Sequence, residues 1–209
     1  MKKEWRKEEK NIYLPKNAPE LITIPAFKFF MIEGEGNPNE PFFEEYISVL
    51  YALSYAVKMS PKSGNAPAGY EEYTVYPLEG VWDISESAKA ENKTALDKNQ
   101  LVFNLMIRQP DFVTDEYAAS IIALTKKKKP HALLDNVKFG TIEEGPCVQM
   151  LHMGSYDAEP ASFELMEAFA ARQGVKRTSK IHREIYLSDP RKVSPDQLKT
   201  VLRFQVSAM

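Results

Sequence analysis

Apolar and polar residues follow one another along this chain in a pattern that predicts the same order of elements twice. In the first half, an apolar strand at 27–32 precedes a helix at 40–59, whose apolar residues recur at the three-to-four-residue spacing of one helix face. A stretch rich in proline and glycine then breaks the chain. Two further strands are expected at 71–78 and 100–108. The first half therefore predicts a strand–helix–strand–strand unit.

The second half repeats this order of elements. Its segments are a strand at 147–153, a helix at 160–173, and strands at 180–187 and 199–207. We predict one α+β domain over residues 1–209, built from a first repeat at about 20–110 and a second at about 140–207. By analogy with other paired repeats, we expect pseudo-twofold symmetry and a ligand cleft between the repeats.

Two further helices are predicted from their ends. An inserted helix at 114–129 has Thr114 as a candidate N-cap and finishes in four lysines, Lys126 to Lys129. These lysines could form a phosphate or nucleic-acid patch, but a solvated helix end explains them better because no basic or aromatic residue repeats nearby. A short helix after 180–187 should begin at Ser194, which has Gln197 three residues later as in a capping box.

Composition narrows the classes of function. The formal net charge of the 209 residues is −2, so no global basic field favours direct binding of nucleic acid. One cysteine, Cys147, excludes an internal disulfide framework and is typical of a reducing compartment. The charged start lacks the apolar region of a secretory signal, and no stretch approaches the roughly 18 apolar residues of a membrane span. We expect a cytoplasmic protein without a membrane partner; the sequence does not indicate its oligomeric state.

Strand 180–187 carries the most informative candidate chemistry. Alternation along a strand predicts a core face with one charged exception, made of Ile181, Arg183, Ile185 and Leu187. The other face carries His182, Glu184 and Tyr186. If that face lines an apolar cleft, desolvation makes Glu184 a candidate general base or a counter-charge for a cation. A half-exposed strand with a surface carboxylate is the competing interpretation.

The corresponding strand of the first repeat supplies the aromatic candidates. Aligning Tyr76 with Tyr186 places Thr74 opposite Glu184, so that the cleft would hold a single acid. Trp82 could close one end of the cleft, although an ordinary core position is equally compatible with a tryptophan.

Other chemistry finds little support in the sequence. His131, His152 and His182 lack metal-ligand spacing, and Cys147 begins a strand that is expected to be buried. No P-loop, dinucleotide fingerprint or GxSxG motif is present. We therefore predict neither a metal site nor a cofactor.

Four motifs, in this order, make the chain resemble the GyrI-like small-molecule-binding proteins, and its closest resemblance is to their stand-alone branch. The motifs are YPLEGVW at 76–82, MIRQPDFV at 106–113, HMGSY at 152–156 and EIYLSDP at 184–190. The resemblance extends over roughly residues 20–207. It implies the tandem fold predicted above and a cleft for flat, hydrophobic and often cationic molecules. Asp83 departs from the pattern, because relatives often carry a second aromatic residue after the tryptophan.

The resemblance also suggests an activity. Multidrug-sensing relatives meet the positive charge of a drug with a carboxylate at the position of Glu184, and some stand-alone members hydrolyse cyclopropane-bearing DNA-alkylating compounds, a detoxification. We expect such hydrolysis here, with Glu184 assisting water and either Tyr186 or Tyr156 donating to the developing oxyanion. The ligand contacts expected besides these residues are Trp82, Tyr76, His182, Phe103 and His152. Two alternatives stay open, a non-catalytic binder or sequestering protein for cationic amphiphiles and a gyrase-modulator-like interaction protein.

Overall fold

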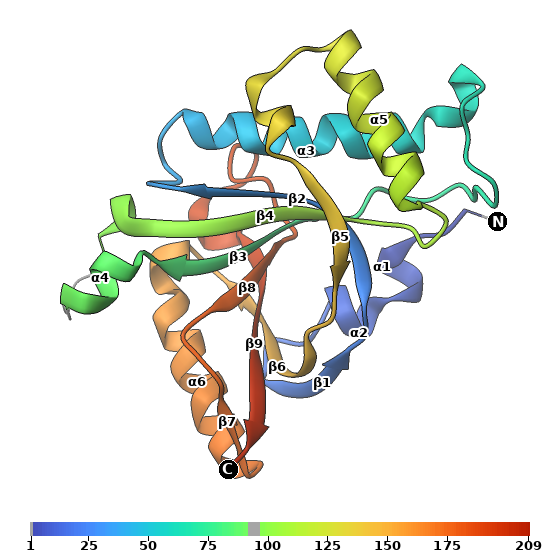
Figure 1. The fold of residues 1–209 in the computed structure, drawn as a ribbon. Helices are drawn as coiled ribbons and strands as arrows, with labels where there is room; N and C mark the ends of the chain where they lie inside the picture. The colour runs from blue at the N-terminus through green and yellow to red at the C-terminus, as the bar shows by residue number, and fades with distance from the viewer. Residues whose placement is uncertain (1, 92–96) are drawn as a thin grey trace. The chain divides into compact units, whose positions relative to one another are not determined.

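The computed structural model describes residues 2–91 and 97–209, which form two compact units (Figure 1). The first unit comprises the residues up to Lys3 together with Phe27–Ile142. The second unit comprises Glu4–Ala26 together with Glu143–Met209. The second unit is therefore assembled from two separate stretches of chain.

The first unit is an antiparallel sheet with the strand order β3-β4-β2-β5. Its strands are β2 (Phe27–Glu35), β3 (Leu78–Ile84), β4 (Leu101–Gln109) and β5 (Lys138–Ile142). Its helices are α3 (Phe42–Lys58), α4 (Glu86–Glu91), α5 (Asp115–Lys128) and the short η1 (Ser60–Ser63), η2 (Lys98–Gln100) and η3 (Ala132–Asp135). Helix α3 packs on β2 and β4 through buried residues that include Leu50, Leu53 and Val57.

The second unit is an antiparallel sheet in the order β1-β6-β9-β8, with β7 paired to β9. Its strands are β1 (Glu20–Ile24), β6 (Gly145–Met153), β7 (Val175–Arg177), β8 (His182–Tyr186) and β9 (Lys199–Ala208). Its helices are α1 (Trp5–Glu8), α2 (Lys10–Tyr13), α6 (Glu159–Arg172) and the short η4 (Tyr156–Ala158) and η5 (Pro195–Gln197). Helix α6 covers β6 and β9, where Met166 and Ala170 pack on Val148, Leu202 and Phe204.

The two units confirm the predicted repeat. Each contains a strand, a helix and two strands in sequence, namely β2-α3-β3-β4 and β6-α6-β8-β9. The sheet order is also the same, since the fourth element lies between the third and the first in both units. Each unit adds one strand at the free edge of its first strand, β5 beside β2 and β1 beside β6. The predicted α+β class is therefore confirmed.

The strand predicted at 71–78 is wrong, because the strand of this region is β3. Residues 71–77 belong to no strand and form one isolated bridge, between Tyr73 and Lys3. Tyr73 and Tyr76 are buried there, and Pro77 has no N–H to donate to a sheet. The expected alignment of Thr74 with Glu184 therefore fails.

Two smaller predictions are also corrected. Ile181 lies just outside β8 and is exposed, whereas Ile185 is buried as expected. Ser194 begins η5, but its side chain makes no capping bond within the described chain. The predicted capping box is absent because the turn is a single 3-10 turn closed by a backbone bond from Gln197 N to Ser194 O.

Other expectations are confirmed. Thr114 caps α5 by accepting a hydrogen bond from Tyr117 N at 3.2 Å, and Lys126 to Lys129 are exposed. Cys147 is buried in β6, and desolvation raises the pKa of its thiol to about 12, so it is a core residue and not a nucleophile. In the described ranges, none of the helices combines the length and apolar character needed to span a bilayer.

Candidate functional site

Glu184 is a buried carboxylate at the middle of β8. Strand alternation turns its side chain to the face opposite Ile185, and only 8% of Glu184 is exposed. His182, on the same face of the strand, places Nε2 3.0 Å from Glu184 Oε1. The other ring nitrogen, Nδ1, lies 3.4 Å from the carbonyl oxygen of Lys180. An ionised carboxylate can only accept, so Nε2 carries the proton of this bond, donates to Glu184 and holds that carboxylate in place.

Glu159 lies beside Glu184, although the sequence did not mark it as a candidate. It is the first residue of α6, and only 6% of it is exposed. A helical period places Glu159, Ser162, Met166 and Ala170 on the buried face of α6. That period is the signal that could have identified Glu159, because an acid on an otherwise small and apolar face is costly.

The environment of Glu159 favours its neutral form. Desolvation raises its pKa well above the ordinary value, and the charge of Glu184, a hydrogen bond to Glu184 and the charge of Asp157 act in the same direction. Its Oε1 is buried and has no hydrogen-bond partner among the described residues. Two neighbouring buried carboxyls cannot both ionise cheaply, so one proton remains on the pair.

A metal ion is the other charge that could occupy this position. Glu159, His182 and Glu184 each offer one ligand atom, and these three atoms lie within 4.8 Å of one another. His182 was expected to lack metal-ligand spacing along the sequence; in the structure Glu159, from α6, lies beside it, a neighbour that linear spacing does not reveal. One imidazole and two carboxylates would suit a divalent cation, but the hydrogen bond from His182 and a shared proton satisfy the same groups.

Two tyrosines stand near the carboxylates. The rings of Tyr156 and Tyr186 meet edge to face, with centroids 6.1 Å apart. Burial raises the pKa of Tyr156 to about 12, and the nearby charge of Glu184 contributes to the shift. Tyr156 thus keeps its proton at neutral pH and can act as a hydrogen-bond donor. The structure brings Glu184, Tyr156 and Tyr186 together in the second unit.

His152 already uses both of its ring nitrogens. Nδ1 accepts from the hydroxyl of Ser162 at 2.8 Å, and Nε2 donates to the carbonyl of Ser155 at 3.0 Å. His152 is 4% exposed, and these bonds join β6 to α6 and to the turn that carries Tyr156. Its ligand contact therefore stays a prediction.

Trp82 and Phe103 lie in an aromatic group of the first unit. Their ring centroids are 5.4 Å apart, and Phe43 and Tyr46 of α3 pack on Phe103 at 5.2 and 5.4 Å. Gly34 of β2 runs directly beneath these rings, since a Cβ there would lie 2.5 Å from Phe103 Cε2. The close contact fixes how the rings sit on the sheet.

Tyr76 belongs to a different group of the first unit. Arg108 stacks over its ring at 4.5 Å and over the ring of Phe27 at 3.4 Å. Tyr76 is 7% exposed, and its ring lies 6.5 Å from that of Tyr73. Packing with Arg108 and Tyr73 accounts for Tyr76 as a core residue.

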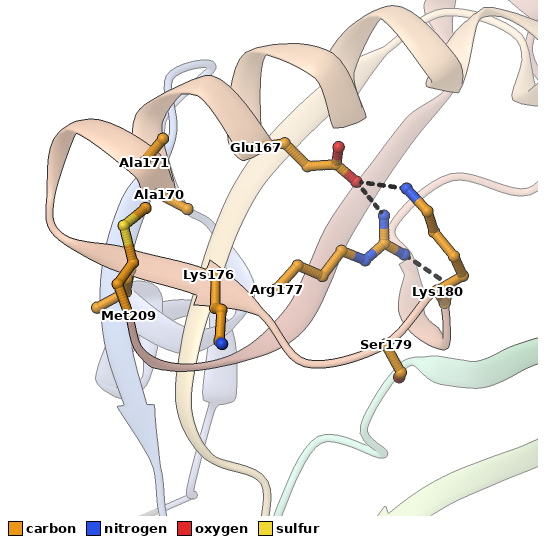
Figure 2. Close-up of a pocket in the computed structure, with 9 residues that line it drawn as sticks. Glu167, Ala170, Ala171, Lys176, Arg177, Ser179, Lys180 and Met209 are labelled. Atoms are coloured by element: carbon orange, nitrogen blue, oxygen red, sulfur yellow. Dashed lines mark hydrogen bonds and ion pairs between the residues drawn. The ribbon is translucent and has the colours of Figure 1, made fainter.

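A hollow of about 380 Å³ occurs elsewhere in the second unit, between the end of α6 and β7 (Figure 2). Arg177 and Lys180 both reach Glu167 there, at 2.9 and 3.1 Å, as the dashed lines in Figure 2 show. None of the candidate residues, all of which are described, lines this hollow. It therefore offers no support for the predicted ligand site.

Comparison with known proteins identifies relatives over nearly the whole chain. The family model described as the GyrI-like small molecule binding domain matches residues 17–207. A crystal structure of a hydrolase from Listeria innocua is 36% identical, with a TM-score of 0.88, and the match covers 98% of this chain and 100% of that chain. A second hydrolase structure from Listeria innocua is 38% identical, with a TM-score of 0.89 and coverage of 99% and 100%.

More distant structures share only the fold. The C-terminal domain of EcmrR is 14% identical, with a TM-score of 0.52, and the match covers 91% of this chain and 98% of that domain. No curated protein matches the chain. The order of elements, the four motifs and the extent of the matches lead to one conclusion: the chain belongs to the GyrI-like small molecule binding domain family.

Proposed function

We propose that this protein binds flat hydrophobic molecules and hydrolyses those that carry a strained, electrophilic cyclopropane ring. The observation that carries the proposal is the buried carboxylate of Glu184, held at 3.0 Å by His182 beside the phenols of Tyr156 and Tyr186. A desolvated carboxylate next to proton donors is the arrangement that general-base hydrolysis needs. Two relatives from Listeria innocua, 36% and 38% identical, are described as hydrolases, which agrees with the proposal.

In the proposed reaction, water attacks the cyclopropane carbon of a ring conjugated to a dienone. The new C–O bond forms as the strained C–C bond breaks, and that electron pair moves through the ring system to the carbonyl oxygen. Glu184 accepts the proton that water loses, and Tyr156 or Tyr186 donates a hydrogen bond to the developing oxyanion. The oxyanion is finally protonated to a phenol, so the product is the substrate plus one water.

The proposed ligand is a small molecule and not a nucleic acid. The protein has a net charge of −2, which does not favour nucleic acid. Its run of exposed lysines lies at the C-terminal end of α5, where the helix dipole favours positive charge. We also propose that His182, on the same face of β8 as Glu184, is a polar contact of the ligand.

Mass spectrometry tests the proposal. The protein is incubated with a cyclopropanoid compound in ¹⁸O-labelled water, and the expected product carries one labelled oxygen. Glu184→Gln keeps the shape and removes the base, so its turnover should fall by about 100-fold or more. Glu167→Gln, which changes an ion-paired glutamate on the same unit, is the matched control and should turn over like the parent.

Binding measurements separate the enzyme from the alternatives. A neutral, unreactive analogue should bind the parent and Glu184→Gln alike, because the charge of Glu184 is not used in holding it. Saturable binding without a labelled product would instead support a sequestering protein, in which Glu184 is a counter-charge for cations. Unchanged turnover in Glu184→Gln would exclude Glu184 as the base.

A further inference from the structure

Glu159 has no role in the proposed reaction, yet its position is costly. It is a second carboxyl group beside Glu184, and both are more than nine-tenths buried. Around them in the second unit stand the imidazole of His182, the carboxylate of Asp157 and the phenols of Tyr156 and Tyr186. No arginine or lysine is assigned to the pair by a described contact. A proton is therefore the simplest neutralising charge.

The contacts of Glu159 and Glu184 indicate which of the two carboxyl groups carries the shared proton. Glu184 receives the N–H of His182 on Oε1, a bond that suits an ionised carboxylate. The carboxyl of Glu159 has a buried Oε1 that accepts no hydrogen bond from a described residue, which a neutral group tolerates far better than a charged one. The proton thus belongs to Glu159, and its bond to Glu184 uses the only donor that a carboxylic acid possesses.

We propose that Glu159 is the positioning residue of the site: it stays protonated, donates its O–H to Glu184, and thereby keeps Glu184 ionised and oriented as the base. This inference rests on the proposed function for its kinetic consequence. The charge of Glu184 would be costly in this buried position without hydrogen bonds, because burial removes the water that stabilises a carboxylate. With donors from Glu159 and His182, its charge is stabilised by two hydrogen bonds, and the proton taken from water goes to Glu184 while Glu159 keeps its own.

Two variants distinguish this role from the others. Glu159→Gln replaces the acid by a neutral group of the same shape that still donates, so its turnover should stay within about threefold of the parent. Glu159→Leu removes the donor, so turnover should fall by about 100-fold and the acidic limb of the pH–rate profile should move to higher pH. Loss of activity in both variants would mean that Glu159 acts as an ionised group and would overturn the proposal, as would parental profiles in both.

Infrared spectroscopy tests the proton without any turnover. Full-length protein with ¹³C-labelled glutamate carboxyls should show at neutral pH the carbonyl stretch of a protonated carboxyl. That band should vanish in Glu159→Gln and persist in Glu167→Gln. A spectrum without the band, or one divalent metal ion per chain that Glu159→Gln releases, would overturn the proposal. If the parent opens no cyclopropane, the proposed function fails, while the band still decides the state of Glu159.

Discussion

Two buried glutamates of the second unit, Glu159 and Glu184, and the partly buried Glu144 are neutralised in different ways. Glu144 lies between Arg183 and Arg203, whose side chains are 3% and 2% exposed, at 2.9 Å from each. Glu184 has a histidine, and Glu159 has a proton. An arginine can be supplied only where the sheet has room for its long side chain, and it would compete with a ligand for the charge of a nearby base. The candidate site therefore neutralises its carboxyl groups with a histidine and a proton, which are smaller than the arginines beside Glu144.

Glu144→Gln should destabilise the fold strongly. The substitution leaves two buried guanidinium groups without their carboxylate, a loss typically of about 3–5 kcal/mol in the free energy of unfolding. Glu167→Gln, at a partly exposed carboxylate, should cost about 1 kcal/mol or less. Urea denaturation of both variants at neutral pH measures the difference. Equal losses would contradict the structural role of Glu144.

The free energy of unfolding should also depend on pH, because of the ion pairs of Glu144. Burial opposes the charge of Glu144, but Arg183 and Arg203 overcome it and lower the pKa of Glu144 below its ordinary value of 4.5. The unfolded chain then binds the proton more readily, so this stabilisation is present above pH 4.5 and is lost as pH falls through the folded-state pKa. The parent should lose stability on acidification more steeply than Glu144→Gln.

The sequence predicted one of the two site carboxyls and not the other. Glu184 was visible because strand alternation places it between His182 and Tyr186 on one face. Glu159 resembled an ordinary acid at a helix start, where the positive end of the helix favours it. The helical period that Glu159 shares with Ser162, Met166 and Ala170 is a local sign of burial, but its position beside Glu184 depends on the tertiary contact between α6 and the sheet, which no local pattern reveals.

At the scale of elements, the aromatic group of Trp82, Phe103, Phe43 and Tyr46 packs between β2 and α3, and Gly34 of β2 lies directly against its rings. In Gly34→Ala the new methyl would lie 2.5 Å from Phe103 and 2.8 Å from Tyr46 Cε1, so the rings must move. We expect a loss of about 1–3 kcal/mol in the free energy of unfolding and weaker binding of an aromatic ligand. Thermal unfolding and ligand titration measure the two effects.

Gly140→Ala is the matched control for this prediction. Gly140 lies on β5 of the same sheet, and an added Cβ would meet only Met31 Cε, at 3.1 Å. The end of a methionine side chain can move at little cost. If Gly140→Ala and Gly34→Ala lost stability equally, the close packing of Phe103 on Gly34 would not be the cause.

The helix starts offer a second test at this scale. Thr114 caps α5 through its side chain, whereas Ser194 at η5 forms no such bond to described residues. Thr114→Ala should therefore lower the free energy of unfolding by about 1 kcal/mol, while Ser194→Ala should change it by less than about 0.5 kcal/mol. A larger effect at Ser194 would show that it caps the turn in solution.

Helices with an apolar face repeated over several turns were predictable from the sequence, whereas the short strand β3 was not. Helices α3, α5 and α6 occur within two residues of their predicted bounds because each presents an apolar face over several turns. The strand at β3 was misplaced because YTVY has stronger strand propensity than LEGVWDI, which contains a glycine and an aspartate. Pairing with β4, from Leu78 with Ile107 to Ile84 with Leu101, overrides that local preference.

For the whole molecule, the repeated order of elements was readable, but the partners of the two added strands were not. Residues 20–24 fell within the predicted bounds of the first repeat, about 20–110, yet they form β1 and pair with β6 of the second unit. β5 follows the inserted helix and pairs with β2. Both strands are five residues long, too short to indicate by pattern which distant edge they join.

The split composition of the second unit has a consequence for synthesis on the ribosome. Residues 4–26 emerge first, but β1 pairs with residues 145–149 of β6, which are made more than a hundred residues later. The segment between them contains every strand of the first unit and can complete its sheet while β1 is still unpaired. During that interval the segment ELITI, which forms β1, has no partner strand, so chaperones can bind it and other chains can pair with it. The second sheet closes only when β9 is released, so the catalytic candidates on it are assembled after every strand of the first unit has been made.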